Sequence, residues 1–252
     1  MKKFAVLLLC AATLICFAAC GTPETGPEKV SIAVLAAMGM EAKQLEKLMD
    51  SARPVKSAGK KFTLGAIGGT EVILHQGGMG LEKAEAGTCA LLENFQPDVL
   101  ILFGMSGGIV PEIALYETVV ASAVFPTWKD DWTSSETDEA LQSLAIGLLD
   151  GARLAPIATG NKMTWRKSDY DRIANACGAV AVDQESYAVA ETARKAGVPL
   201  LIIRSMSDIY ENTSLLGFFK YGPVSAEKAA KDVETVILHL EELENTCPPS
   251  QS

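Results

Sequence analysis

Apolar and polar positions follow two rhythms along this chain. Short, nearly continuous apolar runs are typical of buried strands, and they predict strands at residues 30–37, 71–76, 98–103, 118–125, 154–159 and 199–205. Between them, apolar residues recur at helical spacing, which predicts helices at residues 41–50, 81–94, 139–149, 187–196 and 226–244. Residues 60–65, followed by Gly68-Gly69-Thr70, predict a β-hairpin.

This order of elements predicts one α/β domain. Strands that alternate with helices form a largely parallel sheet with helices on both faces, and the hairpin makes the sheet mixed. No internal repeat or second linker interrupts the pattern. We therefore expect a three-layer α/β/α sandwich with a central mixed sheet over residues 30–245, followed by a tail at residues 246–252.

The first residues predict export from the cytoplasm. Lys2 and Lys3 precede an apolar run at residues 4–19, which is too short to cross a bilayer and ends at Cys20. The segment before Cys20, Phe-Ala-Ala, resembles the bacterial lipobox, in which cleavage leaves a lipidated cysteine; the alternative is an ordinary signal peptide cut nearby. We expect a signal peptide at 1–19, a lipidated Cys20 with a tether at 20–29, and an extracytoplasmic domain anchored to a membrane of the bacterial cell envelope.

Charge and composition narrow the choice of partner. The formal net charge is −9, and loss of the two leader lysines would make it more negative, so nucleic acid is not an expected partner. His75 and His239 are the only histidines and no CxxC pair occurs, which argues against a metal site or a histidine-based triad. Neither dinucleotide-binding glycine spacing nor a Walker lysine is present, and we expect no cofactor.

Candidate site residues follow the predicted strands, where α/β folds place their ligands. Two glycine-rich loops, residues 77–80 and 104–108, would let the backbone approach a ligand closely, although tight turns alone also require glycine. Glu41, Glu185 and Asp208 lie at strand-to-helix junctions. Each alone suits a helix N-terminus, as a cap or as a partner of the helix dipole. Together they predict a cluster of carboxylates at one edge of the sheet.

These segments resemble the nucleoside phosphorylase superfamily, and in particular its hydrolytic branch, 5′-methylthioadenosine/S-adenosylhomocysteine nucleosidase. The resemblance extends from about residue 30 to residue 240 and depends on the order and spacing of loose motifs. The motifs are Ala36-Ala37-Met38-Gly39-Met40-Glu41, Gly78-Met79-Gly80, Gly104-Met105-Ser106-Gly107-Gly108, Asp183-Gln184-Glu185-Ser186 and Arg204-Ser205-Met206-Ser207-Asp208. The resemblance implies hydrolysis of the N-glycosidic bond of an adenine nucleoside.

The resemblance also implies a role for each matched residue. Asp208 would donate a proton toward purine N7, Glu41 would activate the attacking water, and Glu185 would hold the ribose hydroxyls. Arg204 would orient Glu41. Protonating the base neutralises the negative charge that develops as it departs, which is general acid catalysis. Further substrate contacts are implied for Gly78, Gly104, Met163, Thr164, Gln184, Ser207 and Phe218.

Departures from the family pattern bear on specificity. Phosphorylases of this superfamily gather arginines around phosphate, whereas the loop after the first strand here offers Glu41 and no arginine, which favours water as the nucleophile. Gly77 stands in place of a serine, Gln184 in place of a methionine, and Met163 in place of an aromatic residue. The short segment at 125–137 lacks the aromatic residues that line the 5′-alkylthio pocket across a homodimer, so the identity of the 5′ substituent stays open and a homodimer is possible but not favoured by this segment.

Two alternatives remain open at this point. The chain is also compatible with a non-catalytic nucleoside-binding lipoprotein, or with a nucleosidase or phosphorylase for another purine nucleoside. Retention of Glu41, Glu185 and Asp208 favours an enzyme, because a binding protein needs neither a general base nor a proton donor. The altered Gly77, Gln184 and Met163 favour the binding protein.

Overall fold

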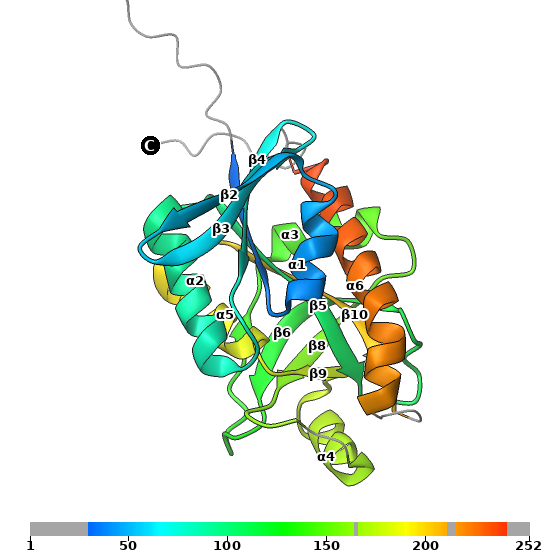
Figure 1. Ribbon diagram of the computed structural model, residues 1–252. Helices are drawn as coiled ribbons and strands as arrows, with labels where there is room; N and C mark the ends of the chain where they lie inside the picture. The colour runs from blue at the N-terminus through cyan, green and yellow to red at the C-terminus, as the bar shows by residue number, and fades with distance from the viewer. Residues whose placement is uncertain (1–29, 164–165, 211–214, 241–252) are drawn as a thin grey trace, which may run out of the picture.

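The computed structural model describes residues 30–163, 166–210 and 215–240 (Figure 1). The predicted signal peptide, Cys20 with its tether, and the predicted C-terminal tail lie outside the described residues. In the described part of the chain, no helix combines the length and the apolar character needed to cross a membrane.

The strands predicted from apolar runs are all present. In β1 every residue from Ile32 to Ala36 is buried, because the strand is covered on both faces. It pairs in parallel with β4 and β5, and β5 pairs in parallel with β10. These strands are β1 (Ser31–Ala36), β4 (Thr70–Gln76), β5 (Val99–Gly108), β6 (Thr118–Pro126), β8 (Arg153–Thr159) and β10 (Leu200–Asp208).

The sheet is mixed, as predicted. The expected hairpin is formed by β3 (Lys60–Ile67) and β4, which pair antiparallel, and β2 (Asp50–Ser57) extends this edge. Short strands β7 (Ser135–Glu136) and β9 (Ala181–Asp183) complete the ten-stranded sheet. Because β5 pairs with both β9 and β10, strands β5, β10, β6, β8 and β9 close into a ring, a feature that the apolar pattern does not predict.

Helices cover both faces of the sheet and confirm the three-layer α/β/α architecture (Figure 1). One apolar core joins the sheet to α1 (Gly39–Glu46), α3 (Glu139–Leu148) and α6 (Leu215–Ile237). A second core joins the opposite face to α2 (Leu81–Phe95) and α5 (Ser186–Ala196). Helix α4 (Lys167–Cys177) lies beyond the end of the sheet, where Tyr170 and Ile173 pack in a smaller cluster.

Two predicted helices have different ends in the structure. Helix α1 ends at Glu46, before the predicted residue 50, because Asp50 begins β2. Helix α6 begins at Leu215 rather than at residue 226, and it contains Pro223, which breaks the helical pattern in the sequence. Residues 215–222 of α6 therefore come before Pro223, whereas the predicted helix begins after this proline.

Candidate functional site

One pocket collects most of the predicted site residues. It lies where β1, β5, β9 and β10 end, and it encloses about 710 Å³ of space, part of it open to solvent. The predicted residues among its lining are Glu41, Met163, Gln184, Glu185, Ser207, Asp208 and Phe218.

Glu41 is buried in the first turn of α1 and is held by backbone amides. Its Oε1 accepts a hydrogen bond from the amide of Met105 at 2.9 Å, and its Oε2 accepts one from the amide of Met38 at 2.7 Å. Burial raises the pKa of Glu41, against the opposing effects of Arg204 and the amides. Gly104 has a φ of +148°, and a Cβ on this residue would overlap Glu41 Oε1. Glycine therefore leaves room for the carboxyl group.

Asp208 ends β10 beside a register shift in its pairing with β5. Such irregularities redirect a side chain away from the regular pleat. Asp208 is 9% exposed, and its Oδ1 accepts a hydrogen bond from Ser207 Oγ at 3.0 Å. Burial raises the pKa of Asp208, while the Ser207 hydroxyl acts in the opposite direction. The carboxyl therefore keeps its proton to a higher pH than an exposed aspartate does.

Glu185 precedes the first residue of α5 and reaches the loop at residues 77–80. Its Oε1 accepts a hydrogen bond from the amide of Gly80 at 2.9 Å. Gly78 and Gly80 have φ values of +99° and +91°, which turn this loop in a way that favours glycine. Burial and the nearby Asp183 raise the pKa of Glu185 to about 7, although Arg204 lowers it.

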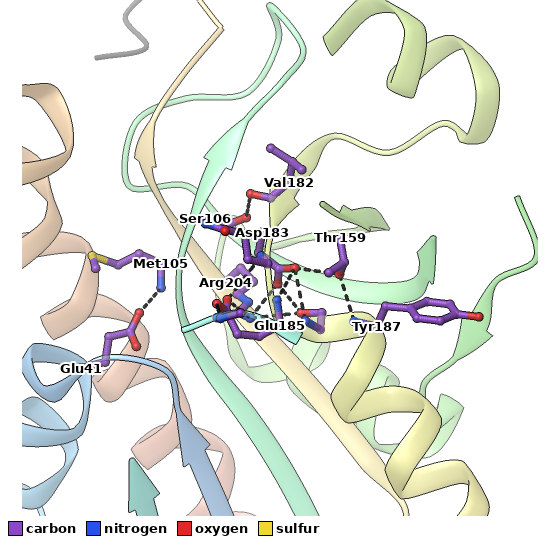
Figure 2. Close-up of polar contacts among 12 residues, drawn as sticks. Glu41, Met105, Ser106, Thr159, Val182, Asp183, Glu185, Tyr187 and Arg204 are labelled. Carbon is purple, nitrogen blue, oxygen red and sulfur yellow. Dashed lines mark hydrogen bonds and ion pairs between the residues drawn. The ribbon is translucent and has the colours of Figure 1, made fainter. Parts of the chain in front are cut away.

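Arg204 is fully buried on β10 and forms its ion pairs away from the first strand. Its Nη2 lies 2.6 Å from Asp183 Oδ2 and 3.7 Å from Glu185 Oε2 (Figure 2). The structure shows no ion pair between Arg204 and Glu41. Arg204 acts on Glu41 through its charge, which lowers the Glu41 pKa, while the carboxylate closest to the guanidinium is that of Asp183.

Asp183 is the main site residue to which the sequence assigned no role. It lies inside a quoted motif, but its partners are distant in the chain. Asp183 Oδ1 accepts a hydrogen bond from Thr159 Oγ1 at 2.8 Å, and the Ser186 hydroxyl donates to Oδ2 (Figure 2). Other lining residues that the sequence did not single out include Met79, Lys162 and Tyr170.

The remaining residues that were predicted to contact the substrate lie behind the pocket lining, at an exposed part of it, or outside the described residues. Gly78 and Gly104 are not among the lining residues and instead shape the backbone beneath Glu185 and Glu41. Met163 lines the pocket but is 49% exposed. Thr164 and Cys20 lie outside the described residues. Among the residues that the structure describes, no group of three or more histidine, cysteine, aspartate or glutamate side chains is arranged to hold a metal ion.

The segment that lacks the family's aromatic residues packs against α5. The ring of Trp128 meets the ring of Tyr187 edge to face at 5.6 Å, and Lys129 Nζ donates a hydrogen bond to the Tyr187 hydroxyl at 2.6 Å. Neither Trp128 nor Lys129 lines the pocket. This segment therefore packs on α5 and contributes no residue to the lining of the pocket.

Solved structures with the same fold include enzymes that act on nucleosides. A 5′-methylthioadenosine/S-adenosylhomocysteine nucleosidase from Streptococcus pneumoniae, with a transition-state inhibitor, matches 84% of this chain and 100% of its own, at 23% identity and a TM-score of 0.78. The corresponding nucleosidase from Streptococcus pyogenes matches 85% and 99% of the two chains, at 23% identity and a TM-score of 0.79. Futalosine hydrolase from Helicobacter pylori matches 82% and 97%, at 22% identity and a TM-score of 0.76.

The sequence itself matches a family model. The match covers residues 31–238, which is nearly all of the described chain, and the model is that of the phosphorylase superfamily. This result confirms the resemblance drawn from the motifs and the nucleoside phosphorylase-like fold expected from it. The chain belongs to the phosphorylase superfamily.

Proposed function

We propose that this protein hydrolyses the N-glycosidic bond of an adenine nucleoside of the 5′-methylthioadenosine or S-adenosylhomocysteine type. The observation that carries the proposal is that Glu41, Glu185 and Asp208 line one pocket and that each has a raised pKa. Perturbed carboxyl groups in a cleft are typical of a catalytic site. The names of the similar structures, nucleosidases and a futalosine hydrolase, support the same class of reaction.

Asp208 acts on the base in this proposal. Its buried carboxyl, whose pKa burial raises, gives its proton to purine N7. The electron pair of the bond between C1′ and N9 then moves to the base, and the bond breaks. Removing negative charge from the leaving group in this way accelerates a reaction by about 10²–10⁴-fold.

The two glutamates act on the sugar and on water. Glu41 takes one proton from a water molecule, whose oxygen forms a bond to C1′. Glu185 accepts hydrogen bonds from the ribose 2′ and 3′ hydroxyls and orients the ring. One water is consumed, the products are free base and free sugar, and the proton on Glu41 and the one lost by Asp208 are exchanged with solvent.

The charges of the pocket favour water over phosphate as the nucleophile. Among the described lining residues, Lys162 is the one basic side chain and no arginine is present. Arg204 lies behind the lining and is already paired with Asp183. A phosphate ion would therefore meet carboxyl groups without an arginine to bind it.

A panel of nucleosides tests this function. The purified protein is incubated with 5′-methylthioadenosine, S-adenosylhomocysteine, adenosine and inosine in phosphate-free buffer, and free base is measured. We expect release of adenine from the first two substrates and formation of an unphosphorylated sugar. Turnover that requires phosphate and yields a sugar 1-phosphate would assign a phosphorylase instead.

The second candidate is a nucleoside-binding protein without activity. Met163, which occupies the position of an aromatic residue in the family pattern, is 49% exposed and offers the base no ring to stack on. Tight binding of these nucleosides, measured by calorimetry, with no base release from any of them would support this candidate.

We also propose that Cys20 is lipidated and anchors the domain to a membrane of the bacterial cell envelope, on its extracytoplasmic side. The support is the sequence at residues 1–20, with its two lysines, apolar run and small residues before the cysteine. Cys20→Ser should abolish acylation and release the domain from membranes with its activity unchanged. Mass spectrometry and membrane partitioning provide the measurement, and an unacylated wild-type protein would contradict the proposal.

A further inference from the structure

We infer that Asp183 is a positioning residue that holds the guanidinium of Arg204 away from Glu41 and so leaves Glu41 free to take a proton from water. The inference rests on the proposed function for the role of Glu41. The arrangement of Asp183 and Arg204 is a property of the folded chain and can be tested without substrate.

Asp183 is a carboxylate surrounded by donors. The amides of Glu185 and Ser186 lie 3.3 and 3.2 Å from Oδ1, which also accepts from Thr159. Its Oδ2 accepts from Arg204 Nη2 at 2.6 Å and from the Ser186 hydroxyl. These contacts come from β8, β10 and the first turn of α5, so the fold fixes the carboxylate from several sides.

Arg204 has an unused side that faces Glu41. Its Nε and Nη1 are buried and have no hydrogen-bond partner among the described residues. A Cβ on Gly104 would lie 3.0 Å from Arg204 Nη1 and would overlap Glu41 Oε1, so the guanidinium and the carboxyl group both lie against this glycine. A small movement of the guanidinium toward Gly104 would create an ion pair with Glu41, and the bond to Asp183 opposes that movement.

The position of Arg204 controls the proton affinity of Glu41. Burial raises the pKa of Glu41, and Arg204 is the charged group that lowers it. Asp183 raises the pKa of Glu185 directly. The other ionisable groups that line the pocket with Glu41 are Lys162, Tyr170, Asp183, Glu185 and Asp208. A closer Arg204 would make Glu41 a weaker base.

The test measures the titration of Glu41 itself. The protein is labelled with ¹³C at the glutamate carboxyl carbons, and the Glu41 signal is identified by its loss in Glu41→Gln. In Asp183→Asn we expect the midpoint of the Glu41 titration to fall by roughly 1–3 pH units, the size of the effect of a new arginine neighbour. The same substitution in an Arg204→Gln background separates the two routes: a shift that comes through the guanidinium should be lost there, whereas an equal shift would show a direct effect of the Asp183 charge and overturn the inference.

Two matched variants separate charge from structure. Ser186→Ala removes the hydroxyl that bonds both Asp183 and Arg204 but keeps both charges, and Asp183→Glu keeps the carboxylate. Both should leave the Glu41 midpoint at its wild-type value. A Glu41 midpoint that does not change in Asp183→Asn would overturn the inference. If Asp183→Asn fails to fold, a shifted midpoint in Asp183→Glu would overturn it instead.

Activity provides a separate readout. In Asp183→Asn the acid limb of the pH profile of kcat should move to lower pH with a lower plateau, while the profiles of the two control variants keep their limbs. A wild-type protein that releases no base from any nucleoside would contradict the proposed function. The carboxyl titrations would still decide whether Asp183 holds Arg204 away from Glu41.

Discussion

Asp183 and Asp208 are two aspartates that end neighbouring parts of the same sheet and have equal exposure. Each is 9% exposed, Asp183 at the end of β9 and Asp208 at the end of β10. Asp183 accepts hydrogen bonds from Thr159, Ser186 and Glu185 and forms an ion pair with Arg204. Asp208 accepts one side-chain hydrogen bond, from Ser207, and faces no basic partner within ion-pair distance among the described residues.

The comparison shows that burial alone does not decide the role of a carboxyl group. Asp208 has the Ser207 hydroxyl and no basic partner among the described residues, so burial outweighs that hydrogen bond, raises the pKa of Asp208 and favours a group that can give up a proton. With a guanidinium and several donors, Asp183 is part of a structural ion pair. The same residue type therefore has a raised pKa at the end of β10, where we propose it as an acid, and forms a buried ion pair with Arg204 at the end of β9.

The largest expected effect is on turnover in Asp208→Asn. The amide can still hydrogen-bond the base but has no carboxyl proton to donate, so kcat should fall by about 10²–10⁴-fold while nucleoside binding largely survives. A base-release assay beside calorimetry measures both quantities. A variant as active as wild type would remove Asp208 from the mechanism.

The second effect is on stability, where the substitution of Asp183 should have a larger effect than that of Asp208. Asp183→Asn leaves the buried charge of Arg204 without its closest partner, and we expect the free energy of unfolding to fall by about 3–5 kcal/mol. Asp208→Asn breaks no ion pair and should cost far less. Urea unfolding of both variants gives the comparison, and an equal loss in the two would contradict it.

The third prediction concerns the pH dependence of stability. The pKa of Glu185 is about 7 in the folded protein, above its ordinary value of 4.5. The proton that it keeps therefore contributes stability below pH 4.5, and this contribution is lost as pH rises through 7. Between pH 5 and 8 the Tm of wild type should fall relative to that of Glu185→Gln, whose amide does not titrate. Parallel Tm curves for the two proteins would show that Glu185 ionises without perturbation.

The smallest effect is expected at Ser207, the side chain that bonds Asp208. Its hydroxyl favours the charged form of Asp208, so Ser207→Ala should raise the pKa of that carboxyl further. Because the active form of Asp208 is protonated, the alkaline limb of kcat/KM should move upward, by roughly 0.5–1 pH unit for one lost hydrogen bond. Movement of this limb to lower pH would contradict the assignment of the acid.

The apolar pattern predicted the parts of the fold that are covered on both faces. Strands such as β1 and β5 are buried along their length, and their runs of valine, isoleucine and leucine identify them without tertiary information. Strand β2 was not predicted, because its residues are mostly exposed and polar at the edge of the sheet. Helix α4 was also missed, since its sequence is rich in polar residues and only Tyr170 and Ile173 are buried.

The sequence predicted those site residues whose position relative to a strand can be recognised along the chain. Glu41, Glu185 and Asp208 follow strands, and the carboxyl ends of strands meet at one edge of the sheet. The partner of Arg204 was not predictable in this way. Asp183 and Thr159 come together only because β8 and β9 pair in parallel with these two residues opposite each other.

The most direct test of the central claim uses water labelled with ¹⁸O. Purified wild-type protein is given 5′-methylthioadenosine in phosphate-free H₂¹⁸O, and the sugar product is analysed by mass spectrometry at early times. The account predicts free adenine and one ¹⁸O atom at C1′ of the released sugar, with release from Asp208→Asn slower by about 10²–10⁴-fold under the same conditions. Absence of base release from wild type, or a sugar product without ¹⁸O at early times, would contradict it.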